Sequence, residues 1–196
     1  LDLTQRSERK FQDMKKVVLL GDSIRLIGYG TKVPEMLGPE YTVWQPSDNG
    51  RYAQYTLHGV LEDWVDGIAG ADIIHWNNGL WDMSVHGDDG VFTPLEAYGD
   101  FIMRIANALK KTTGKIIFAT TTPVRNHPLN NNEIARKYNE YIVPKLEAEG
   151  IIINDLYSLV SANLDDYIRE DDSVHLTAAG IDACSRQICA KIKSLA

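Results

Sequence analysis

The stretch Lys-Val-Val-Leu-Leu-Gly-Asp-Ser-Ile, residues 16–24, decides the fold class. Its four consecutive apolar residues, Val17 to Leu20, are typical of a strand buried on both faces of a parallel sheet, and Gly21 ends the run. Similar short apolar runs recur along the chain, with turn residues and helical patterns between them. This alternation predicts βαβ units and therefore an α/β fold, in which helices cover both faces of a mostly parallel sheet.

The alternation predicts the individual elements as well. Strands are expected at residues 16–20, 41–44, 72–76, 115–120 and 151–155. Helices are expected at residues 52–65, 94–111, 131–149 and 177–195, where apolar residues recur near the 3.6-residue period. Thr93, Pro94 and Glu96 together form a helix-start pattern, while Gly114 and Gly150 end helical stretches. The sheet should therefore contain five strands.

Composition excludes several classes of protein. The 196 residues are 44% hydrophobic and 24% charged, which is ordinary globular usage, and no apolar run approaches the roughly 18 residues of a membrane span. The net charge is −7, and the 20 basic residues form no dense cluster, so nucleic acid is not expected as a partner. We expect one domain over residues 1–196, with an N-terminal extension over about residues 1–15.

The cysteines and the first residue bear on the cellular compartment. Cys184 and Cys189 are five residues apart in a predicted helix and would face different directions, so no disulfide framework is expected. This favours a cytoplasmic location. The chain begins with Leu1 rather than methionine, which is consistent with a processed form, an excised domain or a trimmed chain. The oligomeric state is not indicated.

Polar residues follow the predicted strands, at the edge where ligands bind in open parallel sheets. Ser23 follows the first strand, where its hydroxyl could act as a nucleophile, although Asp22 and Ser23 could equally cap a helix. Near the other end of the chain, Asp172 precedes His175 by three residues on a predicted loop. An imidazole that takes the serine proton and a carboxylate that orients it are what nucleophilic catalysis by serine requires. The three residues therefore form a candidate triad.

Acyl transfer also needs donors for the developing oxyanion. The chain reads Ser-Asp-Asn-Gly-Arg-Tyr at residues 47–52, after the second strand, and His-Trp-Asn-Asn-Gly-Leu-Trp-Asp at residues 75–82, at the end of the third. Asparagine followed by glycine is also an ordinary turn signal. Their position at the strand ends nevertheless makes both segments candidates for the oxyanion site.

In these motifs the chain resembles the SGNH (GDSL-type) hydrolases. The resemblance rests on Gly21-Asp22-Ser23, on the glycine and asparagine blocks after the second and third strands, and on Asp172-x-x-His175, and it covers residues 16–196. It implies a three-layer α/β/α sandwich of flavodoxin-like type and ester hydrolysis without metal or cofactor. It also implies Ser23 as nucleophile, His175 as general base and then acid, and Asp172 as the orienting carboxylate.

The resemblance also implies an oxyanion hole made of the Ser23 N–H, a glycine N–H and an asparagine side chain. Gly50 corresponds to that glycine. The usual third block, Gly-x-Asn-Asp, reads Gly-Leu-Trp-Asp at residues 79–82, with Trp81 where the asparagine is expected. We therefore predict Asn77 as the side-chain donor, with Asn78 in reserve.

Other residues near these motifs have candidate roles in binding. The candidate substrate-binding residues are Trp81, Arg51 and Asp22. Tryptophans at strand ends are often core residues, which is the alternative for Trp81. The arginines Arg25 and Arg51 could instead pair with Asp22 or Asp82. The polar loop at residues 126–132 follows the fourth strand and is expected at the rim of the site. The histidines show no metal-ligand spacing, so no metal is expected.

The sequence thus predicts a serine esterase. We expect it to remove short acyl groups, acetyl above all, from a small molecule or an oligosaccharide, because no lipid-binding cap or long amphipathic insertion is evident. Lysophospholipase or thioesterase action is the enzymatic alternative. A non-catalytic carbohydrate-binding subunit would not require the complete triad, and a nucleotide-binding domain is disfavoured because no phosphate-binding glycine loop follows the first strand.

Overall fold

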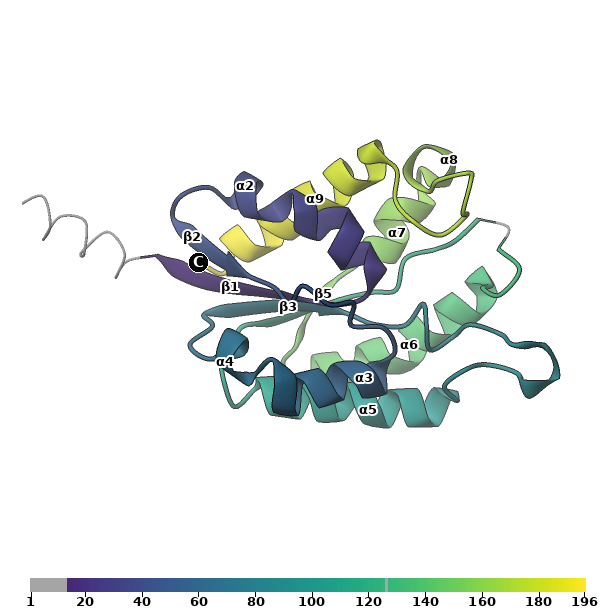
Figure 1. Ribbon diagram of the computed structural model, residues 1–196, viewed down its shortest axis with the longest axis horizontal. Helices are drawn as coiled ribbons and strands as arrows, with labels where there is room; N and C mark the ends of the chain where they lie inside the picture. The colour runs from purple at the N-terminus through teal and green to yellow at the C-terminus, as the bar shows by residue number, and fades with distance from the viewer. Residues whose placement is uncertain (1–13, 126) are drawn as a thin grey trace, which may run out of the picture.

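The fold is built on a single sheet of five strands, as the computed structural model in Figure 1 shows. The structure describes residues 14–125 and 127–196. The strands are β1 (Lys15–Leu20), β2 (Tyr41–Trp44), β3 (Ile73–Asn77), β4 (Ile116–Ala119) and β5 (Ile152–Asn154). They lie in the order β2-β1-β3-β4-β5, and every neighbouring pair is parallel. The prediction of five strands in a parallel sheet is confirmed, with strand bounds within two residues of those expected.

Helices cover both faces of this sheet (Figure 1). One layer contains α2 (Val33–Leu37), α7 (Leu156–Ser161), α8 (Leu164–Tyr167) and α9 (Ala178–Lys193), and the other contains α3 (Ala53–His58), α4 (Val65–Ile68), α5 (Leu95–Leu109) and α6 (Asn132–Ala148). The predicted three-layer α/β/α sandwich is confirmed. The predicted N-terminal extension, about residues 1–15, falls mostly outside the described residues, and Lys15 already belongs to β1.

The apolar strand residues form the centre of the core. Val17 to Leu20 in β1 and the central residues of β3 and β4 are fully buried, because helices lie over both sides of the sheet. Side chains cap some of the helices: Asn131 accepts a hydrogen bond from the N–H of Glu133, and Thr177 accepts one from Gly180. The expected cap by Thr93 is not formed, because Pro94 takes the cap position of α5 and makes no side-chain cap bond. Cys184 and Cys189 are buried free thiols.

The expected continuous helix over residues 52–65 is wrong. The segment forms α3, then a π-helical turn, η3 (Gly59–Asp63), and then α4 after Trp64. The Trp64 ring packs against Gly59, where a β-carbon would lie 2.5 Å from it, so the chain widens into a π turn to bury the indole. Short one-turn elements, η1 (Ile24–Gly28), η2 (Tyr29–Thr31) and η4 (Gly87–Asp89), were not predicted. Within the described ranges, no helix combines the length and apolar character needed to cross a bilayer.

Candidate active site

Ser23 lies at the carboxyl edge of the sheet, where β1 turns into η1. Gly21 makes the tight turn possible: its φ is +145°, and a β-carbon there would lie 1.9 Å from Asn77 Oδ1. Asp22 caps the following turn, since its Oδ1 accepts a hydrogen bond of 2.9 Å from the N–H of Ile24. Ser23 makes no capping bond with its side chain. The capping role considered for this pair therefore belongs to Asp22, and the Ser23 hydroxyl is left for other partners.

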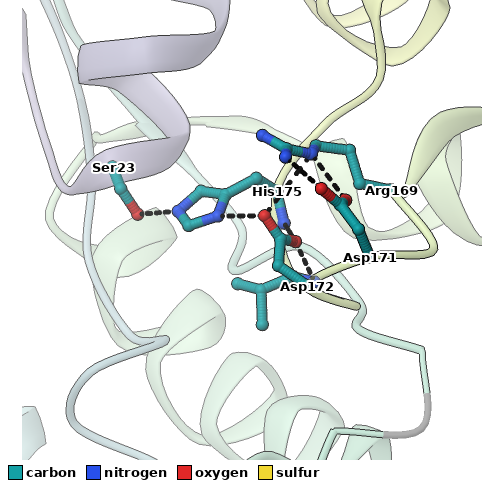
Figure 2. Close-up of polar contacts among 6 residues, drawn as sticks. Ser23, Arg169, Asp171, Asp172 and His175 are labelled. Carbon is teal, nitrogen blue, oxygen red and sulfur yellow. Dashed lines mark hydrogen bonds and ion pairs between the residues drawn. The ribbon is translucent and has the colours of Figure 1, made fainter.

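The three predicted triad residues come together in one chain of hydrogen bonds (Figure 2). Ser23 Oγ lies 2.9 Å from His175 Nε2, and His175 Nδ1 lies 2.9 Å from Asp172 Oδ2. Ser23 and His175 are 152 residues apart in sequence, and the parallel topology brings the end of β1 beside the loop that precedes α9. The arrangement is that of a nucleophile, a base and an orienting carboxylate.

The loop that carries Asp172 and His175 fixes both side chains. Asp172 Oδ1 accepts hydrogen bonds from the N–H of Val174 (2.9 Å) and of His175 (2.8 Å), and Ser173 between them adopts a left-handed conformation with φ of 62°. Burial alone would raise the pKa of Asp172, but these two N–H donors and the His175 imidazole outweigh it and hold the pKa at about 2. Asp172 is therefore a carboxylate at neutral pH.

Arg169 and Asp171 flank the triad on its outer side (Figure 2). Arg169 Nε lies 2.9 Å from Asp171 Oδ1 and 3.5 Å from Asp172 Oδ2, so the guanidinium touches both carboxylates but binds Asp171 in a two-pronged pair. Asp171 makes no contact with His175 or Ser23 in the described structure. It therefore stands next to the triad without belonging to it.

A cavity of about 610 Å³ opens beside the triad. Ser23, Asp172 and His175 all line it, and so does Trp81, one of the predicted substrate-binding residues. His127, Leu129 and Asn130 come from the loop after β4, so the expected rim position of that loop is confirmed for its described residues. The remaining lining residues are Leu26, Ile27, Asn49, Leu80, Ser84, His86, Phe92 and Val174.

Asn77, the predicted side-chain donor to the oxyanion, already has hydrogen-bond partners inside the protein. Asn77 is the last residue of β3 and is buried, and its Nδ2 donates to Asp22 Oδ1 at 2.8 Å. Its Oδ1 accepts a hydrogen bond of 2.6 Å from the Tyr29 hydroxyl. The amide oxygen and one hydrogen of the NH₂ group are therefore bonded inside the protein, and the NH₂ group holds Asp22, the residue before Ser23.

The reserve residue Asn78 and the predicted Gly50 also have hydrogen-bond partners within the protein. Asn78 Nδ2 donates to Thr56 Oγ1 at 2.9 Å and to the Arg51 carbonyl at 3.1 Å, and the residue is fully buried. The Gly50 N–H donates to the Gly21 carbonyl at 2.9 Å. Neither group lines the cavity. The two segments are held together by these bonds instead of presenting donors to a substrate.

Asp22 and Arg51, the other predicted substrate-binding residues, do not line the cavity. Asp22 is buried away from the cavity, and burial raises the pKa of its carboxyl, while the hydrogen bonds from Asn77 and Ile24 act in the opposite direction. Arg51 lies 4.5 Å from the centre of the Tyr55 ring and 3.7 Å from Asp48 Oδ1. The expected pairing of an arginine with Asp22 or Asp82 is thus replaced by a pairing with Asp48.

Arg25 has a structural role in the same region. Its buried guanidinium donates to the carbonyls of Pro46 (2.8 Å), Asp48 (2.5 Å) and Gly21 (3.3 Å). Three carbonyl acceptors around one guanidinium join the turn after β1 to the loop after β2. This clasp fixes the loop that carries Asn49 against the turn that carries Ser23.

Asn49 is the polar cavity residue that sequence reasoning missed. Its Oδ1 accepts a hydrogen bond of 2.8 Å from the Arg51 N–H, and the residue lines the cavity together with Ser23 and His175. No acceptor for its Nδ2 is found among residues 14–125 and 127–196. Residues 47–52 follow the second strand and form a candidate segment for the oxyanion site, so the sequence does indicate this region. Within it, the resemblance to the hydrolase family points to Gly50 and not to Asn49.

No cluster of three or more potential metal ligands is found among the described residues. Comparison with protein-family models gives no match, and comparison with curated proteins gives none either. Many solved structures, in contrast, are similar in fold.

Three of these solved structures illustrate the likeness. A lipase/acylhydrolase from Enterococcus faecalis is 17% identical, with a TM-score of 0.79 over 92% of this chain and 96% of its own. A GDSL-like lipase from Bacteroides thetaiotaomicron is 16% identical, with a TM-score of 0.71 over 98% of each chain. An acetylxylan esterase from Geobacillus stearothermophilus is 16% identical, with a TM-score of 0.73 over 91% of this chain and 94% of its own. At these identities the likeness is one of fold, and the chain therefore has the fold of the SGNH (GDSL-type) hydrolases, as its motifs predicted.

Proposed function

We propose that this protein is a serine-dependent ester hydrolase that works through an acyl-enzyme intermediate on Ser23. The observation that carries the proposal is the unbroken series of hydrogen bonds from Ser23 Oγ through His175 to Asp172, each of 2.9 Å, at the mouth of a cavity. A non-catalytic binding subunit would have no need for this arrangement. The acylhydrolases and esterases among the structures of similar fold add support.

In the proposed mechanism His175 first acts as a base. Ser23 Oγ attacks the ester carbonyl carbon while His175 Nε2 takes its proton, and the imidazolium that forms is stabilised by the Asp172 carboxylate at Nδ1. The tetrahedral intermediate then collapses, and His175 gives the proton to the departing alcohol. Water attacks the acyl-enzyme in the same way, with His175 again taking and returning the proton, and the acid is released.

The oxyanion formed in these steps needs hydrogen-bond donors. We assign this role to the Ser23 N–H, for which no acceptor is found within the described ranges, and to Asn49 Nδ2. The Arg51 N–H donates a hydrogen bond to Asn49 Oδ1, so the amide is oriented before substrate binds. Hydrogen-bond donors that are oriented in advance stabilise the negative charge of the transition state, which is usually the largest contribution to catalysis of this kind. Asn49 thereby takes the part first predicted for Asn77.

Two substrate classes fit this chemistry. Removal of acetyl groups from carbohydrate, the expectation from the sequence, is supported by the acetylxylan esterases of the same fold. The lysophospholipase or thioesterase alternative is supported by a different observation, the apolar side chains that line much of the cavity. The reaction at Ser23 is the same in both cases.

Covalent labelling tests the proposal directly. A p-nitrophenyl alkylphosphonate should release one equivalent of p-nitrophenol and leave a phosphonyl group on Ser23, which peptide mass spectrometry would locate. Ser23→Ala should abolish labelling and lower kcat on p-nitrophenyl acetate by about three orders of magnitude or more. Labelling at Ser84, the other serine that lines the cavity, or full activity of the alanine variant would refute the assignment.

A further inference from the structure

Exposed apolar side chains gather at the triad. Six large hydrophobic residues of the described structure are substantially exposed, and four of them line the cavity beside Ser23: Ile27 (52% exposed), Phe92 (52%), Trp81 (43%) and Leu129 (40%). Single exposed apolar residues are normal on a protein surface, but several around one concave site indicate a binding surface. Leu26, Leu80 and Val174 extend this apolar wall.

The wall is assembled from segments that are far apart in the sequence. Leu26 and Ile27 belong to the η1 turn directly after Ser23, while Trp81 and Phe92 stand at the two ends of an excursion after β3. That excursion is held as a narrow ribbon by the Phe92 N–H, which donates to the Ser84 carbonyl at 2.8 Å. A bond of 2.6 Å from the Val85 N–H to the Leu129 carbonyl ties the ribbon to the loop after β4. The apolar residues are thus presented by segments fixed to one another.

The position of the apolar wall relates it to the acyl group. Ile27 lies four residues after Ser23 on the same turn and both line the cavity, so the apolar wall begins beside the hydroxyl that would carry the acyl group. Aromatic rings alone could stack on a sugar, but Ile27 and Leu129 are aliphatic and provide no hydrogen bond to a hydroxyl group. An aliphatic chain is the ligand that gains most from contact with all four side chains.

We propose that this cavity binds the aliphatic acyl chain of the ester, so that the enzyme prefers longer acyl esters over acetyl esters. The inference rests on the proposed function and names its substrate class. An acyl chain remains attached to Ser23 through acylation and deacylation, so burial of its methylene groups contributes to the binding of both transition states. The prediction of an acetyl substrate rested on the lack of an evident lipid-binding cap or long amphipathic insertion, and the cavity provides an apolar surface without either.

An ester series with a constant leaving group measures this preference. For p-nitrophenyl acetate, butyrate, hexanoate and octanoate, kcat/KM should rise with chain length, by up to about fourfold for each methylene that is buried. We expect at least a tenfold advantage of octanoate over acetate. A flat or falling series would overturn the inference and leave the proposed function standing, whereas absence of hydrolysis for every ester would overturn the proposed function itself.

Variants of the wall show whether the cavity is responsible. Ile27→Ser and Leu129→Ser are changes at exposed positions, and each should lower the octanoate-to-acetate ratio of kcat/KM by about threefold to tenfold. Leu61→Ser is the matched control, because Leu61 is 48% exposed but lies in η3, away from the cavity, and it should leave the ratio unchanged. An unchanged ratio in both wall variants, or an equal loss in the control, would show that the chain does not bind here.

Discussion

Replacing Asp172 with asparagine would change which ring nitrogen of His175 carries a proton. Asp172 Oδ1 accepts from the N–H groups of Val174 and His175, while Oδ2 faces His175 Nδ1 at 2.9 Å. In the asparagine variant only the amide oxygen can accept the two backbone bonds, so the NH₂ group must face Nδ1. The ring would then keep Nδ1 as an acceptor and carry its proton on Nε2, the atom that must take the proton of Ser23.

The size of the effect follows from this reversal. The side-chain shape and both backbone hydrogen bonds are kept, so folding and KM should change little, while kcat should fall roughly 10⁴-fold, or by about 5 kcal/mol of transition-state stabilisation. The assay is steady-state hydrolysis of a p-nitrophenyl ester, with circular dichroism to confirm that the variant is folded.

Asp171→Asn provides the matched control. It makes the same chemical change one residue away, in a carboxylate that pairs with Arg169 and does not contact the imidazole. Its kcat should stay within about threefold of the wild type, because exposed ion pairs contribute little. If Asp172→Asn kept more than a tenth of the wild-type kcat, or if both variants were equally damaged, the proposed role of Asp172 would be refuted.

Two further predictions concern other parts of the site and the core. Asn49→Ala should lower kcat by about 10²–10³ with little change in Tm. Asn78→Ala should instead lower the free energy of unfolding by roughly 1–3 kcal/mol, because it leaves buried hydrogen-bond partners unsatisfied. Steady-state kinetics and thermal melts measure both effects, and the opposite pattern would return the oxyanion role to Asn78. Burial lowers the pKa of His75 to about 3, below the usual value near 6.5. Between these two pH values the unfolded chain therefore binds a proton that the folded protein does not. This histidine should make the free energy of unfolding about 2 kcal/mol smaller at pH 5 than above pH 7. Burial raises the pKa of Asp82 from its usual value of 3.8 to about 7. Between these two pH values the folded protein binds a proton that the unfolded chain does not, so the contribution of Asp82 to the free energy of unfolding increases as the pH falls from about 7 towards 3.8. Urea unfolding of the wild type and of His75→Gln at pH 5 and pH 7.5 tests the histidine. The free energy of unfolding at pH 5 minus that at pH 7.5 should be about 2 kcal/mol more positive in the variant, which lacks the imidazole, and an equal difference in both proteins would contradict the buried neutral imidazole.

The sheet and the triad could be predicted because their signals are local. Interior parallel strands are continuous apolar runs, so the run from Val17 to Leu20 identifies β1 almost to the residue. Ser23 and the pair Asp172 and His175 stand directly at element boundaries, and the parallel topology alone brings such boundaries to one edge. Neither inference required knowledge of side-chain packing.

The proposed oxyanion donor, Asn49, could not be predicted because the choice depends on which way each side chain points. Asn77, Asn78 and Asn49 all stand at the correct edge, yet the first two turn into the core and the third faces the cavity. The apolar wall escaped prediction for a related reason. Ile27 and Leu129 are isolated apolar residues in separate loops, and only the folded chain brings them to one surface.

Ser23 and His175 lie 152 residues apart in the sequence, so the proposed nucleophile and base meet only in the assembled fold. Ser23 stands on the turn after β1, and His175 stands on the loop that leads into α9. This helix packs against α2, which follows the Ser23 turn in the sequence, so the contact between the two helices links the segments that carry the pair. Displacement of α9 from the sheet would leave the serine without its proposed base, and the proposed hydrolysis of esters would therefore report on the docking of this helix.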